Sequence, residues 1–164
     1  MPLAALGVFI LTADTCNVTG GAPAGSSSTP GGTITVAKGH AMTDSNGESV
    51  TVTGFSTKGV DPSGFLPLPA GKECLGISVT VKNGSSTEWT LPLSEVSVVD
   101  ASGQKYDGLS SDNAACLNST SIDSLVAGGS GAGTVYLAVP SAGALDVNWS
   151  PSDLSGQVFQ TPLG

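Results

Sequence analysis

Segments of this chain alternate apolar and polar residues with a period of two, and this pattern limits the fold more than any other feature. Successive side chains of a β-strand point to opposite faces of a sheet, so such a segment buries one face and exposes the other to water. One-sided burial is typical of antiparallel sheets. The apolar positions are Leu75, Ile77, Val79 and Val81; Val135, Leu137 and Val139; and Leu145, Val147 and Trp149.

Less regular runs of β-forming residues predict further strands. They lie at residues 34–36, 50–55, 95–99 and 104–107. The step from Val52 to Phe55 breaks the alternation, which indicates a β-bulge near Gly54. Pro140 and Pro151 each end a predicted strand. About seven short strands joined by frequent turns predict an all-β, immunoglobulin-like antiparallel β-sandwich.

Residues 1–32 differ in character from the predicted sandwich at 33–164. Residues 1–12 are apolar and uncharged, too few for a membrane span of roughly 20 residues but suited to the core of an export signal. The basic start of a signal is missing, so an atypical signal, a start further upstream and an N-terminal strand stay open. Residues 20–32 contain only Gly, Ala, Pro, Ser and Thr, which predicts a disordered tether.

Cys16 follows the apolar segment, at the place where bacterial lipoproteins carry a lipid-modified cysteine. The residues before it, Ala13-Asp14-Thr15, depart from the usual lipoprotein pattern because Asp14 is charged. Lipidation of Cys16 and simple cleavage of the signal therefore both stay open. We expect contact with a membrane only through such an anchor, and a location in the cell envelope or outside the cell.

The charge balance makes nucleic acid an improbable partner. The chain has 5 Lys, no Arg and 13 acidic residues, for a formal net charge of −8. Binding to a phosphate backbone requires clustered cations, and Arg is the side chain that most often reads guanine. We therefore expect no nucleic-acid binding.

Cys74 and Cys116 remain once Cys16 is set aside, and we expect them to form a disulfide that clamps the sandwich. In an exported chain, two such cysteines normally pair. Their separation is 116 − 74 = 42 residues. Metal binding by this pair is the alternative, but the chain has neither CxxC spacing nor a His nearby.

The order of motifs along the chain resembles a known family. A VTVTGF strand and a Pro-rich crossing precede Cys74-Leu-Gly-Ile-Ser-Val-Thr-Val-Lys-Asn83, and Gly103-Gln-Lys-Tyr106 and Thr-Val-Tyr-Leu-Ala-Val-Pro140 follow. This set is similar to the telokin-like, immunoglobulin-fold domain of unknown function of bacterial extracytoplasmic lipoproteins, a fold shared by a secreted mycobacterial immunoprotective antigen. The resemblance covers about residues 33–149 and implies a fold and an extracytoplasmic setting. It transfers no catalytic residue.

The residues in these motifs are expected to have structural roles. Asn83 and Gly84 suit a left-handed turn, and Gly103 suits the turn after Asp100. We expect the Tyr106 hydroxyl to bond a backbone carbonyl at the edge of the sandwich. Trp89 lies in a polar run and is expected to be exposed.

Few residues suggest chemistry. His40 is the single His, and no Ser lies in a G-x-S-x-G turn. His40 and Met42 could be soft copper ligands, but such a site needs more ligands than the chain offers. Asp100, Asp107 and Asp112 lie near turns and could converge on calcium, although no EF-hand loop is present. We predict no catalytic residues, no metal site and no cofactor.

Taken together, these patterns predict a non-enzymatic binding or scaffold domain outside the cytoplasm. We expect its partners to be proteins at the cell surface. An envelope protein that binds metal through acidic loops, or that assists an enzyme, is the alternative. The sequence does not specify the ligand or the oligomeric state.

Overall fold

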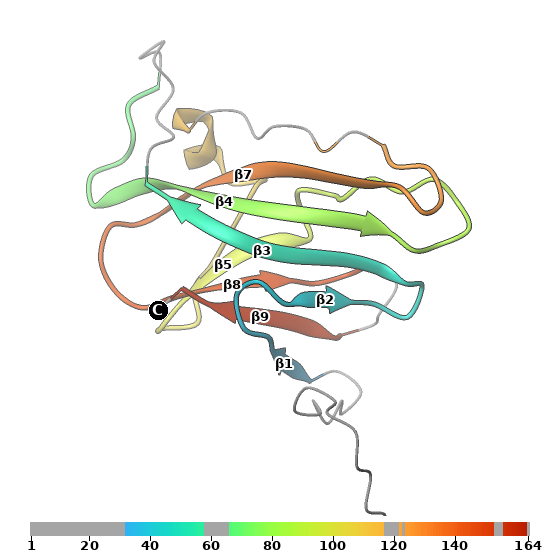
Figure 1. Ribbon diagram of the computed structural model, residues 1–164. Coiled ribbons are helices and arrows are strands. Elements are labelled where there is room, and N and C mark those ends of the chain that lie inside the picture. The colour runs from blue at the N-terminus through green and yellow to red at the C-terminus, as the bar shows by residue number, and fades with distance from the viewer. Residues whose placement is uncertain (1–31, 58–65, 117–121, 123, 153–155, 164) are drawn as a thin grey trace, which may run out of the picture.

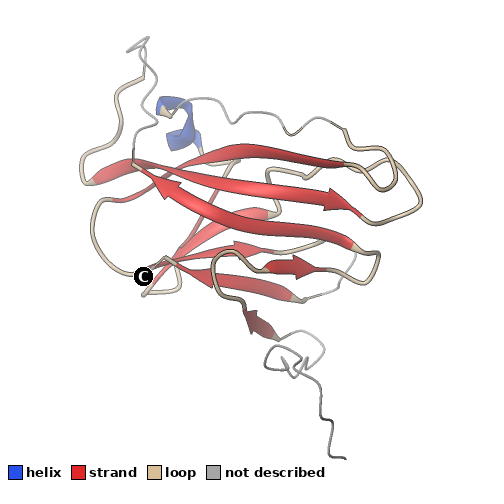
Figure 2. Cartoon of the chain, viewed as in Figure 1, coloured by secondary structure: helices blue, strands red, loops and turns tan. Residues whose placement is uncertain are grey.

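The computed structural model describes residues 32–57, 66–116, 122, 124–152 and 156–163, and these form two β-sheets packed face to face (Figures 1 and 2). The predicted export segment, Cys16 and nearly all of the tether lie outside the described residues. The two-sheet, all-β arrangement confirms the predicted sandwich. Within the described residues, no helix is both long and apolar enough to cross a membrane.

Each sheet has a defined strand order. The five-stranded sheet runs β1 (Thr33–Thr35), β9 (Val158–Pro162), β8 (Leu145–Trp149), β5 (Val96–Asp100) and β6 (Lys105–Asp107). The four-stranded sheet runs β2 (Ala41–Thr43), β3 (Glu48–Ser56), β4 (Lys72–Asn83) and β7 (Ser130–Pro140). A short 3₁₀ helix, η1 (Ser111–Ala115), precedes β7. Pairing is antiparallel except between β1 and β9, which are parallel.

The alternating residues of the sequence form the main core between the sheets. Leu75, Ile77, Val79 and Val81 of β4 are all buried, as are Val135, Leu137 and Val139 of β7 and Val147 and Trp149 of β8, while Leu145 is partly buried. Trp149 of β8 stacks on Phe159 of β9 with ring centroids 5.4 Å apart. Burial of apolar side chains stabilises the fold by roughly 25 cal/mol for each Å² removed from water.

Two strands were not predicted, and one irregularity was. β2 has a single buried apolar residue, Met42, and β9 alternates between partly buried and buried residues for only four residues before Pro162. Such short runs give no clear period. The predicted bulge near Gly54 is confirmed, because the β3–β4 register shifts between Val52 and Gly54.

The expected left-handed turn at Asn83 and Gly84 is wrong. No described residue other than glycine has a positive φ, and Gly84 is not among the glycines that do. Gly84 is required for another reason, since a Cβ atom there would lie 2.1 Å from the carbonyl oxygen of Gly47. Gly103 does adopt a positive φ, of 85°, in the turn after Asp100, as expected.

Candidate functional site

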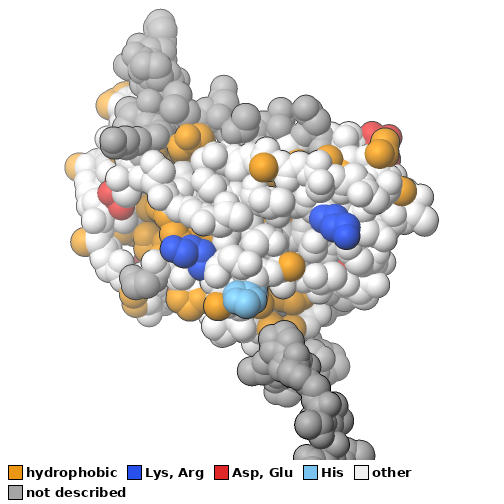
Figure 3. All heavy atoms as spheres, in the orientation of Figure 1, with side chains coloured by type: hydrophobic (Ala, Val, Ile, Leu, Met, Phe, Trp, Pro, Cys, Tyr) orange, Lys and Arg blue, Asp and Glu red, His pale blue; other side chains and the backbone are white. Residues whose placement is uncertain are grey.

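The broad outer face of the four-stranded sheet carries few charged side chains (Figure 3). Its outward positions are mainly Ser and Thr, because the alternation that buries apolar residues on one face leaves Ser49, Thr51, Thr80 and Ser78 on the other. Charged side chains, and side chains joined by hydrogen bonds or a disulfide, gather instead around η1, at the end of the sandwich where β7 ends. We name this region, from Lys72, Cys74 and residues 100–116, the η1 clamp.

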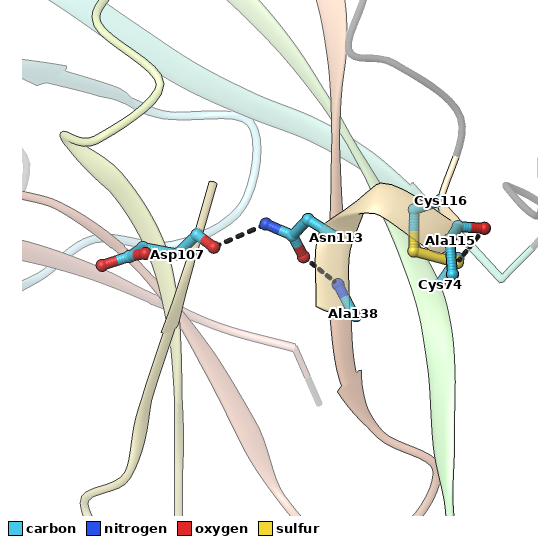
Figure 4. The surroundings of a disulfide bond; sticks show 6 residues. All are labelled: Cys74, Asp107, Asn113, Ala115, Cys116 and Ala138. Atoms are coloured by element: carbon cyan, nitrogen blue, oxygen red, sulfur yellow. Dashed lines mark hydrogen bonds between the residues drawn. A yellow bond between two sulfur atoms is a disulfide. The ribbon is translucent and has the colours of Figure 1, made fainter. Parts of the chain in front are cut away.

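A disulfide between Cys74 and Cys116 joins β4 to the C-terminal end of η1 (Figure 4). Cys74 alternates with the inward Leu75 and therefore lies on the outer face of the sheet. With Ala138 the two cysteines form a small buried cluster, separate from the main core, against which Leu68 and Tyr136 pack. The disulfide therefore holds η1 onto one sheet. The expectation that it clamps the two facing sheets together is wrong.

Asn113 of η1 links the two sheets through its side-chain amide (Figure 4). Its Nδ2 donates to the carbonyl oxygen of Asp107 on β6, at 2.5 Å, and its Oδ1 accepts from the amide of Ala138 on β7, at 2.6 Å. β6 and β7 are edge strands of different sheets. Asn113 therefore satisfies an edge N–H of β7, a group that could otherwise pair with a foreign strand.

Lys72 holds Asp112, the residue of η1 that precedes Asn113. Lys72 Nζ lies 2.5 Å from Asp112 Oδ2 and 5.2 Å from the ring centroid of Tyr106. The ion pair is partly exposed, so its own contribution to stability is small, roughly 0–1 kcal/mol. The position of Lys72 matters more for the arrangement of the sheets. Lys72 begins β4, and its ammonium group lies over the ring of Tyr106 on β6, which belongs to the other sheet.

Asp100 organises the β5–β6 turn with both carboxylate oxygens. Oδ1 accepts bonds from the amide and hydroxyl of Ser102 and from the amide of Gln104, at 2.6–3.0 Å. Oδ2 accepts from the Tyr106 hydroxyl at 2.9 Å, so the expected bond from Tyr106 to a backbone carbonyl is wrong. The hydroxyls of Ser102 and Tyr106 lower the pKa of Asp100 from 3.8 to about 2, and the bond to Asp100 raises the pKa of Tyr106.

The hydrogen bonds to Asp100 predict how the stability of the fold depends on pH. The depressed pKa of Asp100 means that its charged form stabilises the fold fully above pH 3.8, and that this contribution is lost as pH falls toward about 2. Asp100→Asn should therefore reduce the acid sensitivity of unfolding in that window, which denaturant titrations at several pH values would measure. Equal pH slopes for the two proteins would show that Asp100 does not act this way.

The three aspartates proposed as calcium ligands are held by different partners. Asp100 bonds its own turn and Asp112 pairs with Lys72. Asp107 accepts from the amide of Leu109 at 3.1 Å, and its other oxygen lies 3.7 Å from Lys105 Nζ. The part of the chain that the structure describes contains no group of three or more His, Cys, Asp or Glu side chains placed to hold a metal ion.

The two possible copper ligands are not brought together. His40 is exposed between β1 and β2, whereas Met42 is buried in the main core, where its sulfur accepts a bond from Thr161 at 3.8 Å. Trp89 was expected to be exposed but is partly buried. It packs against the main core and forms a β-bridge with Leu125.

The burial of two polar residues, Glu95 and Asn83, was not predicted from the sequence. Glu95 accepts the indole N–H of Trp149 and the amide of Ser152, each at 3.1 Å. Asn83 is fully buried at the end of β4. Glu95 lies in no recognisable motif because its partners are far away in the sequence, whereas Asn83 ends a motif strand but was expected to form a turn.

Solved structures with the same fold support the architecture. An uncharacterised β-sandwich protein from Clostridium difficile 630 has 15% identity and a TM-score of 0.52, over 79% of this chain and 93% of that one. The yjhA protein from Bacillus subtilis has 12% identity and a TM-score of 0.56, over 78% and 98%. The secreted protein MPT63 from Mycobacterium tuberculosis has 20% identity and a TM-score of 0.54, over 77% and 96%.

Sequence comparison assigns the chain to a family. No curated protein matches it significantly. The family model described as a domain of unknown function, DUF4352, matches residues 39–158. This span extends from the loop before β2 to the first residue of β9 and includes the whole η1 clamp. The chain therefore belongs to the DUF4352 family.

Proposed function

We propose that this protein is an extracytoplasmic, non-enzymatic module whose η1 clamp presents a rigid surface to a protein partner. The observation that carries the proposal is the way the clamp is held. The disulfide, Asn113 and the Lys72–Asp112 pair fix η1 to both sheets. A surface that is already ordered loses little conformational entropy on binding, which favours affinity.

The clamp displays an apolar side chain beside its fixed bonds. Leu109, between β6 and η1, is 78% exposed. The adjacent Gly108 lies against Leu93, which is also exposed, since a Cβ atom at Gly108 would be 3.3 Å from Leu93 Cβ. Contiguous exposed apolar patches rimmed by polar groups mark protein–protein contact sites, and we propose that Leu109 and Leu93 contribute to such a patch.

The setting outside the cytoplasm rests on the disulfide. Stable disulfides are found mainly in oxidising compartments, and MPT63, which shares the fold, is a secreted protein. Attachment through Cys16 and release after cleavage are both compatible with this proposal. The non-enzymatic assignment is supported by the clamp, where the Asp100 carboxylate and the Tyr106 phenol are both occupied in fixing a turn.

A site-specific crosslinking experiment tests the proposal. A photoreactive amino acid at Leu109 should yield a discrete protein adduct in intact cells, because a bound partner would cover this position. The matched control is Val126, which is 70% exposed but precedes the other end of β7. A photoreactive group there should yield no such adduct.

Two results would contradict the proposal. One is the same adduct pattern from both positions, or none from position 109. The other is a rise in melting temperature on adding calcium that is lost in Asp107→Asn, which would favour a metal-binding function.

A further inference from the structure

β1 is an edge strand of the five-stranded sheet, and the structure bonds it on one side (Figure 1). The Val36 amide donates to the carbonyl oxygen of Gln160 at 2.7 Å, and the carbonyl oxygen of Gly32 accepts from the first residue of β9 at 3.3 Å. Backbone groups of successive residues in a strand point to opposite sides, so the even-numbered residues bond β9. The N–H and C=O groups of Thr33 and Thr35 therefore point away from the sheet.

These outward groups form an open, uncharged edge. Thr33 and Thr35 are both exposed. In the part of the chain that the structure describes, their outward N–H and C=O groups have no hydrogen-bond partner. Neither residues 32–36 nor residues 158–160 of β9 contain a charged side chain. An edge of this kind is a template for pairing with another strand.

The other sheet edges are blocked at least in part. On β7, the Ala138 amide is bonded to Asn113. On β6, backbone carbonyl oxygens accept from the side chains of Gln104 and Asn113. β2 lies between turns at residues 38–40 and 45–47, so its three residues have no extended backbone beyond them. β1 is the edge at which bonding to the sheet continues past both ends of the strand, from residue 32 to residue 36.

We propose that two copies of this chain pair through β1 and form a two-fold dimer. With the two strands antiparallel about Ile34, Thr33 of each copy lies opposite Thr35 of the other. Both residues point their backbone groups outward, so each of these two pairs exchanges two N–H···O bonds, which gives four in all. The five-stranded sheets then join into one sheet of 2 × 5 = 10 strands.

The sequence of β1 favours a second copy as the partner. Thr33-Ile34-Thr35 reads the same in both directions, so antiparallel self-pairing places threonine opposite threonine and isoleucine opposite isoleucine. A two-fold interface requires this self-complementarity, and cross-strand threonine pairs stabilise sheets. The formal net charge of −8 opposes association, but the two copies meet at strands without charged residues. The η1 clamp stays accessible, because β6 is the opposite edge of the sheet.

Sedimentation velocity over a range of protein concentrations tests the proposal. The full chain should show a concentration-dependent equilibrium between monomer and dimer. Thr35→Pro removes an outward N–H and no bond to β9, a position where a strand tolerates proline. It deletes two of the four interface bonds and should weaken dimerisation at least about tenfold. Circular dichroism would show that the variant is folded.

Thr43→Pro is the matched control on the edge of the other sheet. The next residue, Asp44, donates its amide to the carbonyl oxygen of Glu48, so the Thr43 amide also points away from its sheet. This variant should dimerise as the unchanged chain does.

Cysteine crosslinking tests the register without depending on a proline variant. In a Cys16→Ser background the remaining cysteines are paired. Ile34→Cys should then give a covalent dimer on mild oxidation, because residue 34 lies opposite itself with Cα atoms about 4.5 Å apart, within the reach of a disulfide. Thr33→Cys should not, since its two copies would lie two residues out of register.

Three results would overturn the proposal. The first is a chain that stays monomeric at millimolar concentration. The second is an equal effect of Thr35→Pro and Thr43→Pro on dimerisation, which would exclude β1 as the specific contact. The third is crosslinking from Thr33→Cys as efficient as from Ile34→Cys, or from neither, which would exclude the antiparallel register about Ile34.

Discussion

Replacing both Cys74 and Cys116 with alanine is expected to lower the free energy of unfolding by about 4 kcal/mol. The bridge closes a segment whose ends are 42 residues apart, and its loss lets the unfolded chain explore many more conformations. The double substitution avoids a lone thiol. Denaturant unfolding of the variant and the oxidised protein would measure the difference, with the exposed substitution Ser45→Ala as a control of small effect.

The position of the disulfide predicts which backbone amides lose protection from hydrogen exchange in the double variant. The cluster of Cys74, Cys116 and Ala138 is separate from the main core. Amide hydrogen exchange should therefore accelerate most at η1 and at Ala138, whose N–H is held by Asn113, while Val79 and Val81 keep their protection relative to global unfolding. An unchanged unfolding midpoint, or uniform acceleration across the main core, would contradict this account.

Asn83→Ala is expected to lower the free energy of unfolding by about 3 kcal/mol, since buried partners left without a hydrogen bond cost about 1–3 kcal/mol each. The substitution removes four bonds and leaves the carbonyls of Thr87 and Leu125 without this donor. The loop after β4 and the segment before β7 would then lose the side-chain bonds that they share through Asn83, while the backbone bonds of residue 83 to Gly128 and Gly129 would remain.

Ser86→Ala is the matched control, because it alters an exposed polar residue in the loop that follows Asn83. We expect it to cost less than about 1 kcal/mol. Chemical denaturation of both variants would make the comparison, with unchanged m-values showing that the transition remains two-state. Similar losses for the two variants would mean that the bonds of Asn83 carry no special weight.

The strands that could be predicted are those with a long enough period. The alternation at β4 and the shorter runs at β7 and β8 mark an inward face without reference to any partner. β9 could not be predicted this way, since it is too short to show a clear period and its pairing with β1 joins distant parts of the chain. The turn at Gly103 was predictable because positive φ is a local property, whereas the need for glycine at position 84 arises from its contact with Gly47.

In the η1 clamp, too, some features can be predicted from the sequence and others depend on contacts between distant residues. The pairing of its two cysteines can be predicted from the sequence, but the partners of Asp112 and Asn113 cannot. Lys72 meets Asp112 across 40 residues of chain, and Asn113 reaches an edge strand of each sheet.

The period-two pattern and the residues that favour turns are properties of consecutive residues. The amino-acid order alone therefore determines that this chain forms short strands with one buried face. Which sheet each strand joins, which face carries the disulfide and which segments Lys72 and Asn113 connect depend on residues that meet only when the sheets close. Tertiary structure decides these features, because hydrogen bonds and burial act over distances in space and not along the chain.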